Sequence, residues 1–495
     1  MSRRQRLTLL ALGIFGFLAA YMYSHTMTPS TMPSKSTAII IGSGLAGLSA
    51  ASELISHRIP VVMLERAAKP GGNSMKASSG INGAPTKFQP KTDDAFYSDS
   101  IRSAGKAMNT MKSYREKLIS TLVNDSSSAI TWLTETIGVD LSRVAQLGGH
   151  TVPRTHRPSG TLPPGYSIVS ALLKSLNSSP LFNLQTSCTV TTLLKSGSKV
   201  NGVSYLNPNG TPATLHGPVI VAGGGFGGDS TGLLAKYRPD LANYPSTNEA
   251  RPGVQPLLTA VGAQLLDMDL VQVHPTGFVD PASPFAPVKF LAAEMLRGEG
   301  GILITPDGKR FVNELDTREE VTNAITALPM ISDAPKQWDV QILLDKGTYG
   351  AAKSHVDFYI SKGLIRKATI AELGAEALDT IIAYANAAAE DQPDKDVFGR
   401  SSFGHWSLKN PDLKSVVYVG RVTPVIHFTM GGVVTSTEAE VLDEKSEPIE
   451  GVWAAGEVVG GVHGGNRLGG SSLLECVVFG RRAGRGCVEY VEKGK

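Results

Sequence analysis

The chain has 495 residues, of which 41% are hydrophobic and 18% are charged. This length excludes a small disulfide-stabilised scaffold, and the balance of apolar and charged residues excludes a largely disordered chain, so a globular protein with more than one compact unit is expected. Lys and Arg number 47 against 44 Asp and Glu, and the net charge of +3 gives no indication of a nucleic-acid partner.

The three cysteines carry no signature of a bound metal or haem. Cys188, Cys476 and Cys487 form no CxxC or CxxCH pattern, so an iron–sulfur cluster, a structural zinc and a covalent c-type haem are not expected, and no metal site is predicted. The spacing of 11 residues between Cys476 and Cys487 leaves open whether they pair in an oxidising compartment. A redox cofactor would have to be held in another way.

Residues 1–35 are predicted to form a signal or signal-anchor segment with a tether. An apolar run over residues 7–23 follows three arginines among the first six residues, which is the layout of a secretory signal or an anchor. Tyr21 fits a cleavage site poorly, which favours an uncleaved membrane anchor. With the arginines in the cytosol, the body would lie on the lumenal side of the endoplasmic reticulum, with the mitochondrial intermembrane space as the alternative.

A strand, a glycine turn and a helix are predicted next. Residues 38–41 are apolar, residues 42–47 read Gly-Ser-Gly-Leu-Ala-Gly, and a helical pattern continues to Ser56. The first glycine allows a tight turn, the second lets a pyrophosphate approach the helix N-terminus, and the third lets the helix pack on the strand. A second strand at 61–64 ends in Glu65, where a carboxylate can bind the adenosine ribose. These features predict a dinucleotide site.

Later segments favour FAD over NAD as the dinucleotide. Glycine-rich stretches at 71–74 and 78–83 are expected along the pyrophosphate and flavin, and strands followed by glycines recur at 219–225 and 451–457. A helix is predicted to begin near Ser471, with its positive end toward the reduced flavin. The residues predicted to bind FAD are Gly42, Ser43, Gly44, Ala46, Gly47, Glu65, Arg66, Gly72, Asn73, Ser74, Ser79, Gly80, Asn82, Gly223, Gly224, Glu457, Arg467, Ser471, Ser472 and Leu473.

Many short motifs from about residue 36 to the carboxyl end resemble, in the same order, the fumarate reductase and succinate dehydrogenase flavoprotein family. The likeness is greatest to the soluble, single-chain fumarate reductases of fungi. It implies an α/β fold in which a Rossmann-like FAD-binding domain, at 36–272 and 424–495, is interrupted by an inserted α+β capping domain at 273–423. Within this range, the apolar residues Leu373, Leu378, Ile381 and Ile382 predict a helix over 370–390. The motifs lie at 65–66, 71–74, 154–158, 274–277, 297–301, 310–314, 427–432 and 466–467.

The resemblance also implies a site for a small dicarboxylate, fumarate or succinate. His274 and His427 match family positions that hold the substrate carboxylates, and the planar fork of Arg467 suits bidentate carboxylate binding. The alternative for each histidine is a purely structural role, as a polar core residue whose hydrogen bonds are satisfied within the protein.

A proton donor and its relay are implied in the same way. Arg318 matches the arginine that donates a proton in family members, and Glu294 and Arg297 match the relay that reprotonates it. An arginine is a very weak acid, yet a developing carbanion can take a proton from it when it is well placed. The alternative for Glu294 and Arg297 is an ordinary i,i+3 surface ion pair.

Two departures from the family bear on function. Ala293 stands where relatives commonly carry a threonine that contacts the substrate, and no histidine between Asn73 and Gly83 offers covalent attachment. Non-covalent FAD is therefore expected, and with it reduction rather than oxidation of the dicarboxylate. The reductant is unidentified, with NADH acting through another protein and free reduced flavin as candidates.

Two alternatives remain to fumarate reduction. One is a relative that acts on another unsaturated acid, such as urocanate or an acrylate, or on a ketosteroid. The other is a non-catalytic flavoprotein that carries electrons or assists assembly at a membrane. The set of Arg467, His427 and His274 favours a dicarboxylate over the first, and the presence of Arg318 and Glu294 argues against the second.

Overall fold

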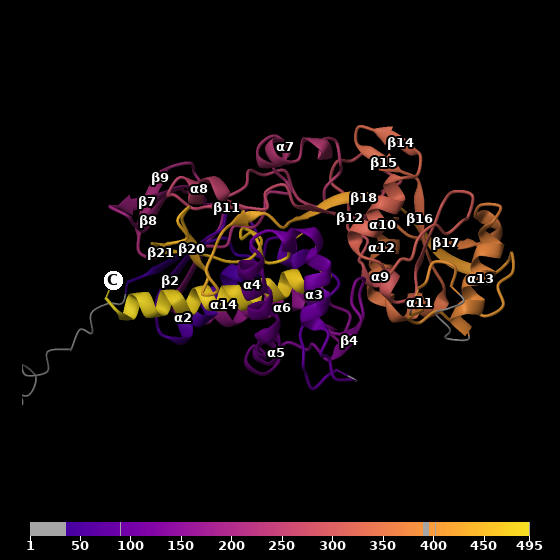
Figure 1. Cartoon of the computed structure of the whole chain (residues 1–495), viewed down its shortest axis with the longest axis horizontal. Coiled ribbons are helices and arrows are strands. Elements are labelled where there is room, and N and C mark those ends of the chain that lie inside the picture. The colour runs from indigo at the N-terminus through magenta and orange to yellow at the C-terminus, as the bar shows by residue number, and fades with distance from the viewer. Residues whose placement is uncertain (1–35, 90, 390–395, 401, 495) are drawn as a thin grey trace, which may run out of the picture. The chain divides into compact units, whose positions relative to one another are not determined.

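The computed structural model describes residues 36–89, 91–389, 396–400 and 402–494 (Figure 1). The predicted targeting segment, residues 1–35, lies outside these ranges. Within them, no helix combines the length and the apolar character that crossing a bilayer requires. The residues from Thr37 onward form one unit, and all contacts described below lie within it.

A six-stranded sheet combines strands that are far apart in the sequence. Its order is β20-β21-β10-β1-β2-β6, and every neighbouring pair is parallel except β20 with β21. The strands predicted at 38–41, 61–64 and near 219 are confirmed, and the one predicted at 451 begins three residues earlier. The bounds are β1 Ala38–Ile41, β2 Val61–Leu64, β6 Phe182–Gln185, β10 Val219–Val221, β20 Glu440–Leu442 and β21 Pro448–Ala454.

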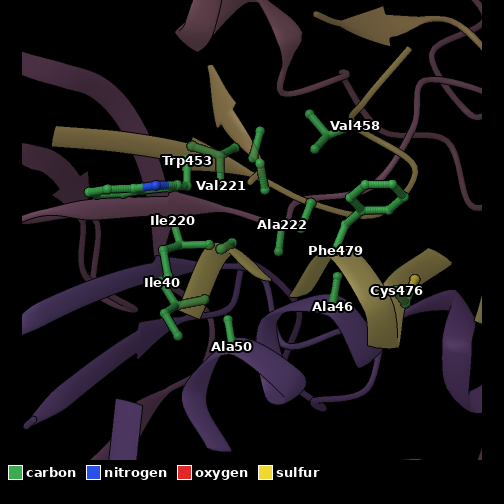
Figure 2. Close-up of a cluster of buried hydrophobic side chains, with 14 of the residues drawn as sticks. Ile40, Ala46, Ala50, Ile220, Val221, Ala222, Trp453, Val458, Cys476 and Phe479 are labelled. Carbon is green, nitrogen blue, oxygen red and sulfur yellow. The ribbon is translucent and has the colours of Figure 1, made fainter. Parts of the chain in front are cut away.

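The core of this part lies between the sheet and two helices, α2 (Leu45–Ser56) and α14 (Ser471–Glu492). Parallel strands are covered on both faces, which explains why their sequences are uninterrupted apolar runs. A Cβ atom at Gly480 would lie 2.5 Å from the carbonyl oxygen of Ala46, so this glycine allows the helices to approach closely. Figure 2 shows part of the cluster, with Ile40, Ile220 and Trp453 from the strands and Ala46, Ala50 and Phe479 from the helices.

Cys476 and Cys487 do not pair in this fold. Both lie on α14, and the helical rise separates residues 11 apart by about 16 Å, whereas the Cα atoms of a disulfide lie within about 7 Å. All three cysteines are free and buried. The continuity of one helix therefore settles the pairing that the sequence left open.

A second, antiparallel sheet forms the middle of the chain. Its order is β12-β18-β16-β13, and β17 also pairs with β18. The predicted borders at 272/273 and 423/424 fall inside β12 and β18, because both strands continue through them. The bounds are β12 Val271–Phe278, β13 Ile302–Ile304, β16 Val340–Leu344, β17 Arg366–Thr369, β18 Val416–Thr429, α9 Met295–Gly298, α10 Arg318–Thr326, α11 Lys346–Ala351, α12 Lys353–Ser361 and α13 Ala377–Ala389.

The helix predicted over 370–390 is shorter than expected. A single 3-10 turn at Ile370–Glu372 is followed by a break, and α13 begins only at Ala377. At Gly374 the chain passes directly against the backbone of Asp307, where a Cβ atom would lie 2.0 Å from the carbonyl carbon. The break is thus set by a contact with a distant segment.

Smaller sheets and helices connect these parts. In one of them, Ile81 pairs with His156 and Asn82 with Thr155, so the 78–83 stretch is joined to the 154–158 motif. The remaining bounds are β3 Ile81–Asn82, β4 Arg143–Ala145, β5 Thr155–Arg157, β7 Thr189–Ser196, β8 Lys199–Leu206, β9 Pro212–His216, β11 Leu265–Leu266, β14 Met330–Asp333, β15 Lys336–Trp338, β19 Gly432–Val433, α3 Phe96–Ala104, α4 Lys112–Asn124, α5 Ser126–Thr131, α6 Pro164–Asn177, α7 Leu233–Tyr237 and α8 Gln255–Thr259.

Candidate active site

The glycine turn after β1 leaves bare backbone at the start of α2. Gly44 is the N-cap of α2, and a Cβ atom there would meet only Ser74 Oγ, at 3.6 Å. A Cβ atom at Gly72 would lie 3.7 Å from Gly44 Cα, and one at Gly224 would have no neighbour within 4 Å. These open glycines beside a helix N-terminus fit the pyrophosphate of FAD, which needs a close approach to backbone N–H groups.

Other glycines of the predicted FAD site are packed against protein. A Cβ atom at Gly42 would lie 2.4 Å from the carbonyl oxygen of Ala222, and one at Gly47 would lie 2.2 Å from that of Gly42. Gly80 and Gly223 are packed closely in the same way. These positions shape the turns, whereas the open glycines supply the surface for the cofactor.

Glu65 ties the glycine turn to the end of β2. Ser43 donates to Glu65 Oε2 from its backbone nitrogen at 3.0 Å and from Oγ at 2.6 Å, and the Ala67 N–H donates to Oε1 at 2.7 Å. An ionised carboxylate offers about four acceptor positions, so one remains for a ribose hydroxyl. Glu65 thus has a structural role besides the predicted contact with ribose.

Asn82 joins two loops that are both predicted to contact the flavin. Its Nδ2 donates to the Gly469 carbonyl at 2.8 Å and to Ser471 Oγ at 2.9 Å, while Oδ1 accepts from Thr155 Oγ1 at 2.7 Å. The helix α14 begins at Ser471, as predicted, after Gly470 with a φ of 80°. The carboxyl-terminal loop is therefore placed beside the 78–83 stretch.

The remaining predicted FAD residues surround these loops. Arg66 donates to the carbonyl of Pro252 at 2.6 Å, and Asn73 Nδ2 donates to Asn248 Oδ1 at 2.6 Å. Both contacts tie the first glycine-rich stretches to the 248–252 segment. Ala46 and Leu473 are buried, and Ser74, Ser79 and Ser472 are partly buried.

Replacing Gly44 by Ala is expected to weaken FAD binding by about 10- to 10²-fold without preventing folding, since an overpacked contact costs about 1–3 kcal/mol. Gly44 has a φ of −66°, which any residue adopts, and its surroundings leave space for a methyl group until a cofactor packs there. The ratio of flavin to protein absorbance measures this. Gly160→Ala, where no atom lies within 4 Å, is the matched control. Full FAD content in Gly44→Ala would contradict the prediction that the pyrophosphate of FAD packs against Gly44.

Arg318 is the centre of a buried polar cluster. It is the first residue of α10, whose start is fixed by a capping box between Thr317 and Glu320. Its Nε donates to Glu294 Oε2 at 2.7 Å, Nη2 donates to the same oxygen, and Nη1 donates to Gln272 Oε1 at 2.7 Å. The arginine and its carboxylate partner are 6% and 2% exposed, so this ion pair is shielded from water.

Glu294 is held ionised by its neighbours. Burial raises the pKa of this carboxyl, but the charges of Arg318 and Arg297 outweigh burial and lower it below its ordinary value. The Gly148 N–H also donates to Glu294 Oε1, at 3.1 Å. A buried carboxylate in contact with the guanidinium of Arg318 is placed where it could accept a proton from another donor and pass it on to that arginine.

Arg297 lies behind this pair. Its Nη1 donates to the carbonyl of Glu314 at 2.7 Å, whereas Nε and Nη2 are buried without a partner among the described residues. Burial lowers the pKa of Arg297 to about 10, with Glu294 opposing the shift. The alternative of a surface ion pair between Glu294 and Arg297 is wrong, because both side chains are buried and the carboxylate bonds to Arg318.

His274 and His427 face each other, with ring centroids 5.4 Å apart. His274 Nδ1 contacts the backbone of Thr276, and its Nε2 is buried without a partner in the described part of the chain, whereas His427 Nδ1 bonds Thr247 Oγ1 at 3.0 Å. Burial, and then the charge of Arg318, lowers the pKa of both rings well below the ordinary value. Both are neutral at neutral pH and can donate a hydrogen bond to a carboxylate.

Arg467 is a buried cation, 3% exposed, that lacks an anionic partner among the described residues. Its guanidinium lies 4.2 Å from the centre of the Phe428 ring, Nε has no partner, and Nη1 reaches only the Leu468 carbonyl at 3.4 Å. Burial and the charge of Arg318 lower the pKa of Arg467 to about 9, while burial raises that of Glu457 to about 7. Because a buried cation without a counter-charge is costly, this guanidinium is suited to binding an anion.

Gln272 connects Arg318 to the loop of Arg467, and sequence reasoning missed it. Besides accepting from Arg318, its side chain donates from Nε2 to Asn466 Oδ1 and to the Arg467 carbonyl, both at 3.0 Å. The available signal was an amide side chain two residues before His274, between Val271 and Val273. The structure thus brings five of the predicted site residues together: Arg318, Glu294, His274, His427 and Arg467. Arg297 is an electrostatic neighbour of Glu294 and Arg318, but its side chain bonds neither of them.

Known proteins with similar sequences and structures share this architecture. The FAD binding domain family matches residues 37–473. The chain is 43% identical over 475 residues to Fumarate reductase 1 of Saccharomyces cerevisiae, covering 91% of this chain and 98% of the relative. It is 39% identical to Fumarate reductase of Schizosaccharomyces pombe, covering 94% and 92%.

A solved structure of similar fold is the open conformation of a flavocytochrome c3 fumarate reductase. Its TM-score is 0.71 at 28% identity, with 96% of this chain and 81% of that chain covered. The mixed α/β fold, the open glycines at positions 44, 72 and 224 and the extent of these matches all indicate a flavoprotein, and FAD is its cofactor. The chain therefore belongs to the fungal-type fumarate reductase family of FAD-binding flavoproteins.

Proposed function

We propose that the protein reduces fumarate to succinate. The observation that carries this proposal is the pair of buried donors without a partner among the described residues, Arg467 Nε and His274 Nε2, in side chains whose pKa values are both lowered by burial and by the charge of Arg318. A substrate with a carboxylate at each end would satisfy both and would neutralise the buried cation. A monoacid or a steroid would leave one of these groups without an anionic partner.

FAD, held at the open glycines Gly44, Gly72 and Gly224, would when bound and reduced be the source of the hydride that fumarate reduction needs. In the proposed reaction, Arg318 donates a proton to one alkene carbon of fumarate as negative charge develops there, so that one hydride and one proton complete succinate. Arg467 and the two histidines hold the carboxylates and thereby orient the double bond toward Arg318.

Glu294, which is ionised at rest, is proposed to take up one proton and pass it to Arg318, so that the carboxylate ends ionised again. The bond of 2.7 Å between Glu294 Oε2 and Arg318 Nε provides the direct route. Arg297, with a pKa of about 10, would be the next donor. Because no hydrogen bond joins the side chains of Glu294 and Arg297 among the described residues, that transfer needs a bridging water or a side-chain movement.

Ala293 bears on the choice of substrate. Its backbone N–H donates to the Tyr359 hydroxyl at 3.3 Å, and its methyl side chain lies in an apolar cluster, so it offers no hydroxyl to a substrate. Loss of one hydrogen bond to a charged group costs about 1.5–3 kcal/mol, which the remaining contacts to a dicarboxylate can offset. Fumarate therefore remains the proposed substrate.

The expected result is rapid anaerobic reoxidation of reduced methyl viologen by the purified protein with fumarate. Urocanate, crotonate and a ketosteroid should give no more than background rates, because each lacks the second carboxylate in reach of Arg467 and His274. Turnover of one of these compounds instead, with FAD bound, would show that Ala293 marks a change of substrate. Absence of turnover with all four would favour the non-catalytic electron carrier.

The FAD is proposed to be non-covalent, since residues 74–82 contain no histidine. Acid precipitation should then leave all flavin in the supernatant, and flavin retained in the pellet would refute this. The electron donor is proposed to be free reduced flavin or NADH acting through another protein, and comparison of the two as donors distinguishes them.

Residues 7–23 are proposed as a membrane anchor, with the body in the lumen of the endoplasmic reticulum or in the mitochondrial intermembrane space. The support is the apolar run after three arginines. Alkaline extraction of membranes should leave the full chain in the pellet. Release into the supernatant would indicate a cleaved signal instead.

A further inference from the structure

His150 lies in the loop between β4 and β5 and is held at both ring nitrogens. Arg154 Nη1 lies 2.7 Å from His150 Nδ1, and His150 Nε2 lies 3.0 Å from the Gly469 carbonyl oxygen. A guanidinium only donates and a carbonyl only accepts, so Nδ1 is the acceptor and Nε2 carries the hydrogen. The tautomer of this 6% exposed imidazole is thus fixed by its partners.

Arg154 is a rigid support for this ring. Its Nε and Nη2 donate to the two carboxylate oxygens of Asp93 at 2.6 and 3.0 Å, and Nη1 also donates to Asp99 Oδ2 at 2.7 Å. Its guanidinium lies 5.0 Å from the centre of the Phe96 ring. All three charged side chains have no exposed surface, so the cluster has little freedom to move.

Gly469, whose carbonyl accepts the hydrogen bond from His150, packs closely against the carboxylate of Glu294. A Cβ atom at Gly469 would lie 2.8 Å from Glu294 Oε2 and 3.0 Å from Oε1. The loop that carries His150 also reaches the same carboxylate directly, through the Gly148 N–H. A displacement of Gly469 by a few tenths of an ångström would therefore move the carboxylate relative to Arg318.

We propose that His150 is a positioning residue for Glu294, which it keeps in contact with Arg318 by fixing the Gly469 carbonyl. This inference rests on the proposed function, in which Glu294 returns a proton to Arg318. Burial and the charge of Arg154 lower the pKa of His150 to about 4, so the ring stays neutral and keeps its tautomer at neutral pH. Through its two hydrogen bonds, the ring ties the Gly469 carbonyl beside Glu294 to the buried ion-pair cluster of Arg154.

Two variants of His150 separate this role from a general structural one. In His150→Asn, the amide oxygen can replace Nδ1 as acceptor for Arg154, but the side chain is too short to reach Gly469. In His150→Gln, the longer amide can still donate to the Gly469 carbonyl. We expect His150→Asn to lower kcat for fumarate by about 10- to 10²-fold with KM little changed, and His150→Gln to retain most activity, because small misplacements of reacting groups have effects of this size.

Further readouts and one additional variant accompany the rates. The solvent deuterium isotope effect on kcat should rise in His150→Asn, since proton return becomes slower, whereas bound FAD and Tm should stay near the wild-type values. Gly469→Ala, whose new methyl group would press on Glu294, should reproduce the loss of kcat with His150 intact. Infrared titration of the Glu294 carboxyl, which needs no substrate, should show a higher pKa in His150→Asn than in the wild type.

The outcomes distinguish the inference from the proposed function. If His150→Asn retains the wild-type kcat, isotope effect and Glu294 pKa, the positioning role is wrong. A fall in Tm and FAD content with unchanged kcat per bound FAD would also overturn it in favour of a structural role. If the wild-type protein does not reduce fumarate, yet the Glu294 pKa rises in His150→Asn, the proposed function fails and the positioning role stands.

Discussion

Replacing Arg318 by Ala is expected to lower kcat for fumarate by about 10³-fold while FAD stays bound, because a positioned proton donor contributes about 10²- to 10⁴-fold to a rate. The variant removes the side chain that joins Glu294 to Gln272 across the site, and it leaves the buried carboxylate with Arg297 as its nearest cation. Viologen-linked turnover gives kcat, and the flavin absorbance gives the FAD content. Arg318→Lys should be nearly as impaired, because a lysine cannot bond Glu294 and Gln272 with one planar group.

Arg366→Ala is a suitable control for this variant. Arg366 forms an exposed ion pair with Glu372 at 3.0 Å, and pairs of this kind contribute little to stability. Its activity and Tm should match those of the wild type. If Arg318→Ala with full FAD content turned over at the wild-type rate, Arg318 would have no part in the reaction, and another group would have to protonate the substrate carbon.

Replacing Arg467 by Met is expected to lower kcat/KM for fumarate by about 10²-fold or more. Each hydrogen bond between charged groups contributes about 1.5–3 kcal/mol, and a carboxylate can accept two from this guanidinium. Steady-state rates over a wide range of fumarate concentration separate the expected rise in KM from any change in kcat. The kcat/KM of Arg467→Lys should lie between those of the wild type and Arg467→Met, since lysine keeps the positive charge but lacks the planar guanidinium that bonds both carboxylate oxygens.

The substrate-free stability of Arg467→Met provides an independent check. Because the guanidinium is buried without an anionic partner in the described structure, an apolar side chain of similar length should leave Tm unchanged or raise it. FAD content must be measured as well, since Arg467 is also predicted to contact the cofactor. A strong fall in Tm would show that Arg467 serves the fold rather than the binding of an anion.

The local elements of the flavin-binding part could be predicted from the sequence. The strands at 38–41 and 61–64 are buried, so their residues are uniformly apolar, and Gly42 directly after the first strand adopts the positive φ that a tight turn into a helix requires. The start of α14 at Ser471 was signalled by the glycines before it. Such features depend on contacts between residues that are close in the chain.

The partners of the site residues depended on the tertiary structure. Spacing alone left open an ordinary i,i+3 ion pair between Glu294 and Arg297, yet the carboxylate bonds to Arg318, 24 residues away, because α10 presents that arginine to the second sheet. In the same way, the helix predicted over 370–390 is interrupted at Gly374, because the backbone of Asp307 passes against that residue.

The sequence by itself therefore determined the family, the cofactor and the identity of most candidate groups, since these follow from residue types at fixed local spacings. The tertiary structure decided which buried charges meet, that Gln272 links Arg318 to Arg467, and that His150 lies between a closed ion-pair cluster and the Gly469 carbonyl. Contacts between residues that lie 24 to 319 positions apart depend on how whole layers pack, and no local pattern encodes that packing.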